Sequence, residues 1–233
     1  MAGRRAPTAV VLAMVICGLV LAASLTGAAV LRVRNSSGHT MPGPTSDTAV
    51  TTGNACKREP CQTLATATVG GTVVELVADS GAASGRLHIG VPGATRQIIE
   101  ATITDMGVTL SQDSLQCVPA AVSACLIRGV GDKGTAGQIV VGRSDKWSPL
   151  GRAFVSRAGL LSLAPVLGDS APEVIAVQWD CARGEDCARR PVYAQVFGLG
   201  GQEVGCTRAF ARVDLLPGWP NIAPAAASLR DCP

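Results

Sequence analysis

Apolar and polar positions alternate over short distances along most of the chain. Beyond residue 55, short apolar runs rich in Val, Ile, Leu and Thr are separated by Gly, Pro, Asp or Ser. This pattern predicts β-strands joined by turns, because β-branched side chains suit a pleated surface and Gly and Pro favour turns. The predicted strands are 64–69, 72–78, 86–91, 97–104, 108–111, 122–127, 138–141, 153–156, 174–179, 192–197 and a last run at 203–213.

No stretch beyond residue 55 sustains an apolar stripe at helical spacing. Residues 223–229 predict a short terminal helix, and 159–167 fit either a strand or a helix. Two Gly-Gly pairs, at 70–71 and 200–201, predict hairpin turns. The chain from 55 to 233 is therefore predicted to be an all-β, disulfide-stapled antiparallel domain, built as a sandwich, a barrel or a small propeller-like fold.

A faint internal similarity bears on that choice. Gly131-Asp132 followed by Trp147 is echoed by Gly168-Asp169 followed by Trp179, although the spacings differ. Such an echo is expected of propeller blades, and it is also expected of any recurring strand and turn. The sequence leaves both interpretations open.

The segment from 8 to 31 differs from the rest of the chain. Its 24 residues carry no charge, and as a helix they extend roughly 36 Å, enough to cross a bilayer core. The competing interpretation is a cleaved secretory signal, for which Gly27-Ala28-Ala29 offers a small-residue site. We expect a transmembrane signal-anchor helix, preceded by a short cytoplasmic tail at 1–7.

Residues 32–54 are rich in Ser, Thr, Gly and Pro and have almost no large apolar side chain. Such a segment buries too little apolar surface to fold by itself. It is predicted to be a flexible tether between the membrane and the β-domain.

Cysteine usage indicates which side of the membrane the domain occupies. Two arginines flank the apolar run on each side, so the charge rule gives no clear orientation. Eight cysteines follow the run, and an even set of this size in one domain is typical of an oxidising compartment. We therefore expect a single-pass protein of the cell membrane with a cytoplasmic N-terminus and the β-domain outside, or a secreted protein if the segment is cleaved.

The spacing of these cysteines predicts their partners. Six fall into close pairs, and the remaining two form a wide pair. A C-x-x-C arrangement, which zinc knuckles and thioredoxin-like sites require, does not occur in the sequence. We expect structural disulfides and no metal site, with the pairs Cys56–Cys61, Cys117–Cys125, Cys181–Cys187 and Cys206–Cys232.

The charge of the chain argues against nucleic acid as a partner. The net charge is +3, but four of the 20 basic residues flank the apolar run, and all 17 acidic residues follow it. The remainder has 16 basic against 17 acidic groups, a net charge of −1. Arg-heavy, Lys-poor usage suggests a GC-rich bacterial genome. The expected partners are the lipid bilayer through residues 8–31 and an envelope protein or wall component, with no cofactor.

Catalytic chemistry has little support in the sequence. The chain has two histidines, His39 in the predicted tether and His88 in a predicted strand. Asp79, Ser80 and His88 are the residue types of a hydrolytic triad, but no G-x-S-x-G elbow accompanies them. Pairs among Glu75, Glu100, Asp105, Glu173 and Glu203 are the corresponding glycosidase candidates. We expect no catalytic residues and a non-enzymatic binding module, with an anchored or secreted hydrolase as the alternative.

Two surface features are the candidate binding residues. The loop 181–190 is the most charged segment of the domain, and a Cys181–Cys187 bridge would make it rigid. Trp219 lies between two prolines near the C-terminus. Arg and Trp are frequent anchors of protein interfaces. The predicted binding residues are Arg183, Arg189, Arg190 and Trp219.

Overall fold

The computed structural model describes residues 56–233 apart from 92, 144–145, 170, 182–186 and 188–189. The predicted membrane span at 8–31 and the predicted tether at 32–54 lie outside the described residues. Within the described part, no helix is long and apolar enough to cross a membrane.

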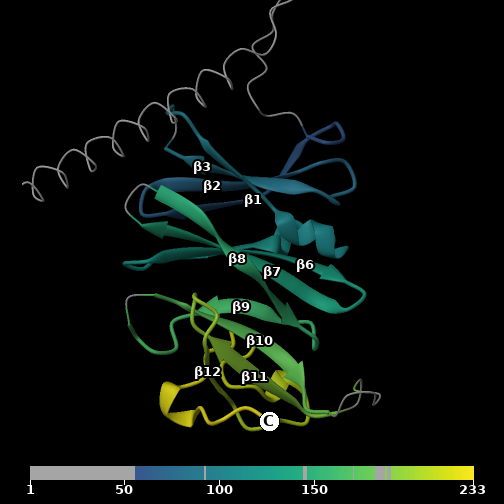
Figure 1. Cartoon of the computed structure of the whole chain (residues 1–233), viewed down its shortest axis with the longest axis vertical. Coiled ribbons are helices and arrows are strands. Elements are labelled where there is room, and N and C mark those ends of the chain that lie inside the picture. Colours follow the sequence, from purple (N-terminus) through teal and green to yellow (C-terminus); the bar gives the residue numbers. More distant parts are fainter. Residues whose placement is uncertain (1–55, 92, 144–145, 170, 182–186, 188–189) are drawn as a thin grey trace, which may run out of the picture. The chain divides into compact units, whose positions relative to one another are not determined.

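The described chain is an all-β structure of three antiparallel sheets, each with four strands (Figure 1). In each sheet the strands follow one another in chain order, so each sheet is an up-and-down meander. The first sheet contains β1 (Gln62–Val69), β2 (Thr72–Ala78), β3 (Gly85–Gly90) and β4 (Gln97–Glu100). The second contains β5 (Leu115–Val118), β6 (Ser123–Gly131), β7 (Gly134–Arg143) and β8 (Lys146–Ser156). The third contains β9 (Leu161–Ala164), β10 (Glu173–Trp179), β11 (Val192–Phe197) and β12 (Glu203–Cys206).

The predicted glycine turns join adjacent strands. Gly70 and Gly71, both at positive φ, connect Val69 of β1 to its partner Thr72 of β2. Two successive residues at positive φ give a turn whose twist matches the strands of a hairpin, and glycine adopts that backbone without strain. Gly201 has a positive φ in the connection between β11 and β12. Both hairpin predictions are confirmed.

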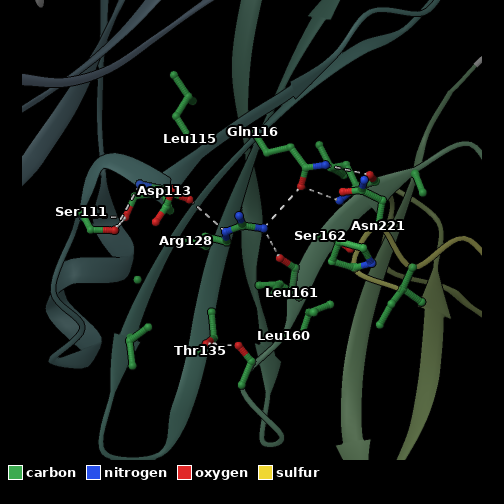
Figure 2. A pocket seen from close by; sticks show the side chains of 18 of the residues that line it. Ser111, Asp113, Leu115, Gln116, Arg128, Thr135, Leu160, Leu161, Ser162 and Asn221 are labelled. Atoms are coloured by element: carbon green, nitrogen blue, oxygen red, sulfur yellow. Dashed lines mark hydrogen bonds between the residues drawn. The ribbon is translucent and has the colours of Figure 1, made fainter. Parts of the chain in front are cut away.

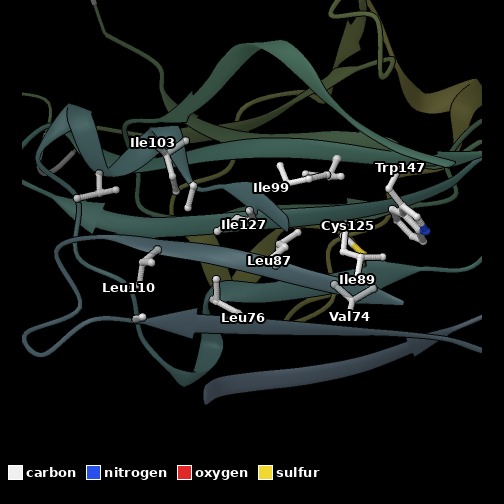
Figure 3. Packing of buried hydrophobic residues seen from close by; sticks show 14 of the residues in the cluster. Val74, Leu76, Leu87, Ile89, Ile99, Ile103, Leu110, Cys125, Ile127 and Trp147 are labelled. Carbon is white, nitrogen blue, oxygen red and sulfur yellow. The ribbon is translucent and has the colours of Figure 1, made fainter. Parts of the chain in front are cut away.

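Adjacent sheets pack face to face through two apolar clusters. Figure 3 shows the first cluster, where Leu76 and Leu87 of the first sheet meet Ile127 of the second. A second cluster joins the other face of the second sheet to the third, with Leu126 and Leu163 in its centre. The second sheet is therefore buried on both faces, which explains why β7 is buried along nearly its whole length.

The C-terminal segment covers the remaining face of the third sheet. Leu216 and Ile222, 2% and 1% exposed, pack with Ile175 and Val177 of β10 in a third cluster. The chain then returns to β12, where Arg230 forms an antiparallel bridge with Cys206. Since β10 has apolar contacts on both sides, its central residues 174–177 are apolar without alternation.

The four cysteine pairs expected from spacing are the pairs within bonding distance in the structure. Cys117 and Cys125 are directly opposite each other on β5 and β6, with 4.0 Å between their Cα atoms. The Cα distances are 5.7 Å for Cys56–Cys61, 5.8 Å for Cys181–Cys187 and 5.0 Å for Cys206–Cys232. The last bridge closes the widest loop and ties the C-terminal segment to β12.

Several local predictions were wrong in their boundaries. The predicted strand at 97–104 ends at Glu100, and Thr102–Met106 is a 3-10 helix. The predicted strand at 108–111 forms a single bridge, Thr109 with Val130, and β5 was missed. The segment 223–229 contains one 3-10 turn, Ala226–Ser228, and the ambiguous 159–167 segment contains strand β9.

The echo between Asp132 and Asp169 does not mark equivalent positions. Asp132 lies in the turn between β6 and β7, whereas Asp169 lies between β9 and β10. Trp147 is the second residue of β8, and Trp179 is the last residue of β10. The repeated unit in the described residues is the four-stranded meander. The two similar sequence stretches do not occupy the same positions within it.

Candidate functional site

A groove of about 1050 Å³ is lined by residues of both the second and the third sheet (Figure 2). One wall comes from β5, β6 and the 3-10 turn Gln112–Ser114, and the other from β9 and the residues just before it. Trp219, Pro220 and Asn221 of the C-terminal segment line the same groove. The groove therefore gathers residues from three distant parts of the chain.

The side chain of Gln116 joins the two walls. Its amide nitrogen donates to the carbonyl of Leu163 and its oxygen accepts from the Leu163 N–H, both at 3.0 Å. β9 is an edge strand of the third sheet, paired on its other side with β10. Gln116 thus satisfies backbone groups of an edge that would otherwise be open, which holds the third sheet against β5.

Arg128, on β6, is the cation at the centre of Figure 2. Its Nε donates to the backbone carbonyl of Asp113 at 3.1 Å. Its Nη1 donates to the carbonyl of Leu161 at 2.6 Å and to Oε1 of Gln116 at 3.5 Å. Burial lowers the pKa of the Arg128 guanidinium, and the nearby Asp113 carboxylate raises it in opposition. An arginine remains charged under such shifts, so the groove contains a partly buried positive charge.

The charge on Arg128 is not paired with any acid that the structure describes. Among the described residues, no carboxylate oxygen lies within 4.0 Å of its guanidinium. Its hydrogen bonds go to two backbone carbonyls and one amide oxygen, all of them neutral acceptors. None of these bonds uses Nη2, which therefore retains two donor hydrogens.

Two hydroxyl groups complete the polar lining of the groove near Arg128. Thr135 donates from Oγ1 to the carbonyl of Gly159 at 2.7 Å. Ser162, on β9, has a buried Oγ with no hydrogen-bond partner in the described structure. Buried hydroxyl groups are normally satisfied, so the Ser162 hydroxyl is an unpaired polar group in the wall of the groove.

Trp219 is 46% exposed, but the backbone that carries it is firmly held. Its N–H donates to the carbonyl of Leu216, and Ala223 donates to the carbonyl of Pro217. The flanking Leu216 and Ile222 are buried in the third cluster, and the Cys206–Cys232 bridge lies beyond them. The indole ring is therefore a half-exposed apolar surface on a fixed turn, as the sequence interpretation of Trp219 as a surface residue requires.

The remaining predicted binding residues are not brought to this groove. Arg190 is exposed and follows the Cys181–Cys187 pair, with its N–H donating to the carbonyl of Cys187. It is not among the residues that line the groove. Arg183 and Arg189 lie outside the described residues.

Sequence reasoning missed Arg128, Gln116 and Ser162. One signal was available for Arg128, because it is the only charged residue between 114 and 131, a segment that is otherwise largely apolar. A lone charge within a buried strand requires partners or a function. Gln116 and Ser162 have no comparable signal, since their importance arises from contacts between strands far apart in the sequence.

The candidate triad is not assembled. Asp79 is buried and accepts a hydrogen bond from the N–H of Ser84, so its carboxylate closes the turn between β2 and β3. His88 lies opposite Glu75, three residues from the turn-proximal pair Ala78–Gly85, which is about 10 Å along the strand. Asp79 and Ser80 are thus separated from the imidazole.

Four of the five candidate glycosidase acids have structural partners, and the fifth, Asp105, is exposed on the 3-10 helix Thr102–Met106. Glu75 forms an ion pair with Arg96, and Glu100 forms one with Arg86. Glu173 is buried, and one of its carboxylate oxygens accepts from the N–H groups of Val166 and Leu167. Glu203 accepts from the side-chain amide of Gln195. These contacts satisfy the carboxylates without bringing any two of them together at the groove.

Comparisons with protein-family models, curated proteins and solved structures find no match to this chain. Among the described residues, there is also no cluster of three or more His, Cys, Asp or Glu side chains that could hold a metal ion.

Proposed function

We propose that this chain is a membrane-anchored binding module of the bacterial cell envelope, without enzymatic activity, and that its partner binds in the groove beside Trp219. The observation that carries the proposal is the half-exposed indole on a turn held by Leu216, Ile222 and a disulfide. Rigid aromatic side chains are favoured at binding sites because little conformational entropy is lost when they become buried. The groove volume of about 1050 Å³ is that of a ligand-binding site.

The location outside the membrane rests on the same features as before, namely the uncharged segment 8–31 and the eight cysteines that follow it. Four cysteine pairs at bonding distance support an oxidising compartment. In this proposal residues 8–31 anchor the chain and residues 32–54 hold the β-domain away from the bilayer.

We infer further that the three meanders are arranged as propeller-like blades. Four-stranded antiparallel meanders are the blades of β-propellers. The first strand of one sheet contacts the first strand of the next, β1 with β5 and β5 with β9, which supports this arrangement. The groove then lies between the inner strands of two successive blades.

The proposal is tested by photo-crosslinking in producing cells. A photoreactive amino acid is placed at position 219 of the full chain or, as a control, at Thr66, an exposed residue of the first sheet. We expect an adduct of one defined mass from position 219 and none from position 66. Adducts of the same mass and yield from both positions, or none from position 219, would contradict the proposal.

Trp219→Ala separates binding from stability. If the indole is a surface contact, the substitution abolishes the adduct from a photoreactive residue at Val130, another residue of the groove lining, while the melting temperature stays nearly unchanged. Val130 is 69% exposed and lines the groove. A buried Trp would instead lose roughly 3–5 kcal/mol of stability on truncation, and a matching fall in melting temperature would overturn the surface role.

A further inference from the structure

We propose that Arg128 binds the carboxylate group of an extended peptide seated in the groove. The inference rests on the proposed function, since it names the ligand class of the same groove. It follows from the electrostatics of the two walls and from the donors that the fold leaves without acceptors.

The first argument is that no carboxylate of the described residues contacts the Arg128 guanidinium, although Asp113 is near enough to raise its pKa. Burying a cation is unfavourable unless it is hydrogen-bonded and paired, and the hydrogen bonds of Arg128 in the described structure end on neutral oxygens. An anion entering the groove would meet a guanidinium already fixed in position by three hydrogen bonds. A charge-assisted bond to a preorganised donor is stronger than a bond between neutral groups.

The second argument is the set of free donors. Nη2 of Arg128 makes no hydrogen bond in the described structure, and the Oγ of Ser162 is buried without a partner. Both residues line the groove. A carboxylate can accept from this guanidinium nitrogen, which the described structure leaves without an acceptor.

A carboxylate fits better than a phosphate because the site offers a single positive charge. Arg128 is the only described cationic side chain that lines the groove, and Asp113, an exposed acid, lines it as well. A dianion generally requires several donors and more positive charge than this. One guanidinium opposed by one exposed carboxylate therefore matches a monoanion.

A peptide fits the remainder of the lining. Half-buried Leu115 and Leu160 and exposed Val130 give apolar contacts beside the polar groups of Gln116 and Ser162. An extended peptide presents apolar side chains and backbone amides in alternation, so it can satisfy both kinds of surface. The carboxylate has two sources, the C-terminus of the peptide or an Asp or Glu side chain, and the experiment must distinguish them.

The competing explanation is structural. Arg128 bonds to Leu161 across the groove, so it could serve only to hold β6 against β9. Asp113→Asn separates the two roles, because the Asp113 carboxylate has no hydrogen-bond donor among the described residues and lies at the exposed rim. Removing its negative charge raises affinity for a carboxylate if the ligand binds at Arg128. It has no effect on carboxylate selectivity if Arg128 only holds the sheets.

The test uses the full chain in detergent micelles and immobilised tetrapeptide pools of mixed sequence. One pool has free C-terminal carboxylates, the second has the same sequences amidated, and the third is amidated with Glu fixed at one internal position. Equilibrium binding is measured for the parent chain, Arg128→Gln, Asp113→Asn and the control Arg152→Gln. Arg152 is a matched control, since it also donates to a backbone carbonyl, that of Gly201, and lies outside this groove.

We expect the parent to bind the free-acid pool at least about tenfold more tightly than the amidated pool. Arg128→Gln should remove this preference, Asp113→Asn should increase it, and Arg152→Gln should leave it unchanged. Tighter binding of the third pool than of the second assigns the site to side-chain carboxylates as well as to C-termini. No such gain assigns it to C-termini alone.

Equal affinity for all three pools, or no binding of any pool, would overturn the carboxylate proposal. An unchanged preference in Asp113→Asn would also overturn it, whether or not Arg128→Gln folds. Equal binding of the three pools leaves the proposed function intact, because the crosslinking from position 219 tests that function separately.

Discussion

At the scale of single residues, Gly129 allows the segment containing Val108 and Thr109 to pack closely against β6. A Cβ at this position would come within 2.7 Å of Cγ2 of Val108 and 2.8 Å of the carbonyl oxygen of Thr109. The second of these atoms belongs to a backbone that is bridged to Val130. The close approach therefore requires a residue without a side chain.

We predict that Gly129→Ala lowers the free energy of unfolding by about 1–3 kcal/mol, because the inserted methyl group must displace backbone. The control is Gly151→Ala in β8, where a Cβ meets no atom within 4 Å and alanine should be neutral or slightly stabilising. Thermal melts of both variants beside the parent chain provide the measurement. A melting temperature for Gly129→Ala as high as that of Gly151→Ala would show that the segment shifts without cost.

We expect His88 to make the stability of the fold depend on pH. Burial lowers the pKa of its imidazole, Arg86 and Arg96 lower it further, and Glu75 and Glu100 raise it in opposition. Its Nε2 is buried without a hydrogen-bond partner in the described structure. The folded state therefore favours the neutral ring.

Because the pKa of His88 is lower in the folded chain than in the unfolded chain, the unfolded state binds the extra proton first. Stability should fall as the pH drops below about 6.5 and continue to fall until the folded imidazole is also protonated. We predict that His88→Gln flattens this part of the melting-temperature curve between pH 7.5 and 5. His39→Gln, in the predicted tether, should retain the slope of the parent, and the same slope in both variants would exclude His88 as its source.

At the scale of elements, the C-terminal segment acts as a cover for the third sheet. It buries Leu216 and Ile222 against β10, presents Trp219 to the groove and ends in the bridge between Cys206 and Cys232. Cys206 and Cys232 are separated by 26 positions in sequence, whereas Cys56 and Cys61 are separated by five. A wider loop has more entropy in the unfolded chain, so closing it stabilises the fold more.

We predict that replacing Cys206 and Cys232 by Ala lowers the free energy of unfolding by about 3.5 kcal/mol, against about 2 kcal/mol for the Cys56 and Cys61 pair. Chemical denaturation of the two double variants measures the difference. The first variant should also lose binding in the groove, since Trp219 loses its fixed position. Equal losses of stability would mean that the C-terminal segment is held by its apolar contacts and not by the bridge.

At the scale of the whole molecule, the sheets differ in how much of each face is covered. The second sheet is buried on both sides, and the third lies between the second sheet and the C-terminal segment. The first sheet carries ion pairs on its outer face, Arg86 with Glu100 and Arg96 with Glu75. These ion pairs remain partly exposed to solvent, whereas the opposite face of the first sheet packs on the second sheet.

The proposed membrane topology can be tested with a reporter fused after Pro233 that is active only in the cytosol. The uncharged segment 8–31 and the eight cysteines that follow it predict a silent fusion. Reporter activity in intact cells would overturn the orientation. Peptides that contain Met14, detected in the mature protein by mass spectrometry, would show that the segment is an anchor and not a cleaved signal.

The sequence by itself determined the elements that depend on local properties. The alternation of β-branched residues and turn residues is a property of neighbouring positions, and so the all-β class, the Gly70-Gly71 turn and most strands could be predicted. Cysteine spacing sets the entropy of each loop, which made the four pairs predictable. Short strands such as β5 were missed because they have too few residues to show an alternating pattern. Their pairing depends instead on contacts with neighbouring strands.

Only the tertiary structure decided the order of the sheets, the face that each strand buries and the groove. Gln116, Arg128 and Ser162 are separated by up to 46 positions, and they face a common space because β5, β6 and β9 belong to adjacent sheets. The sequence also could not determine the exposure of Trp219, since a Trp near prolines can be buried or exposed. It was decided by Leu216 and Ile222, whose burial turns the indole toward the groove, and such packing depends on residues that are distant in sequence.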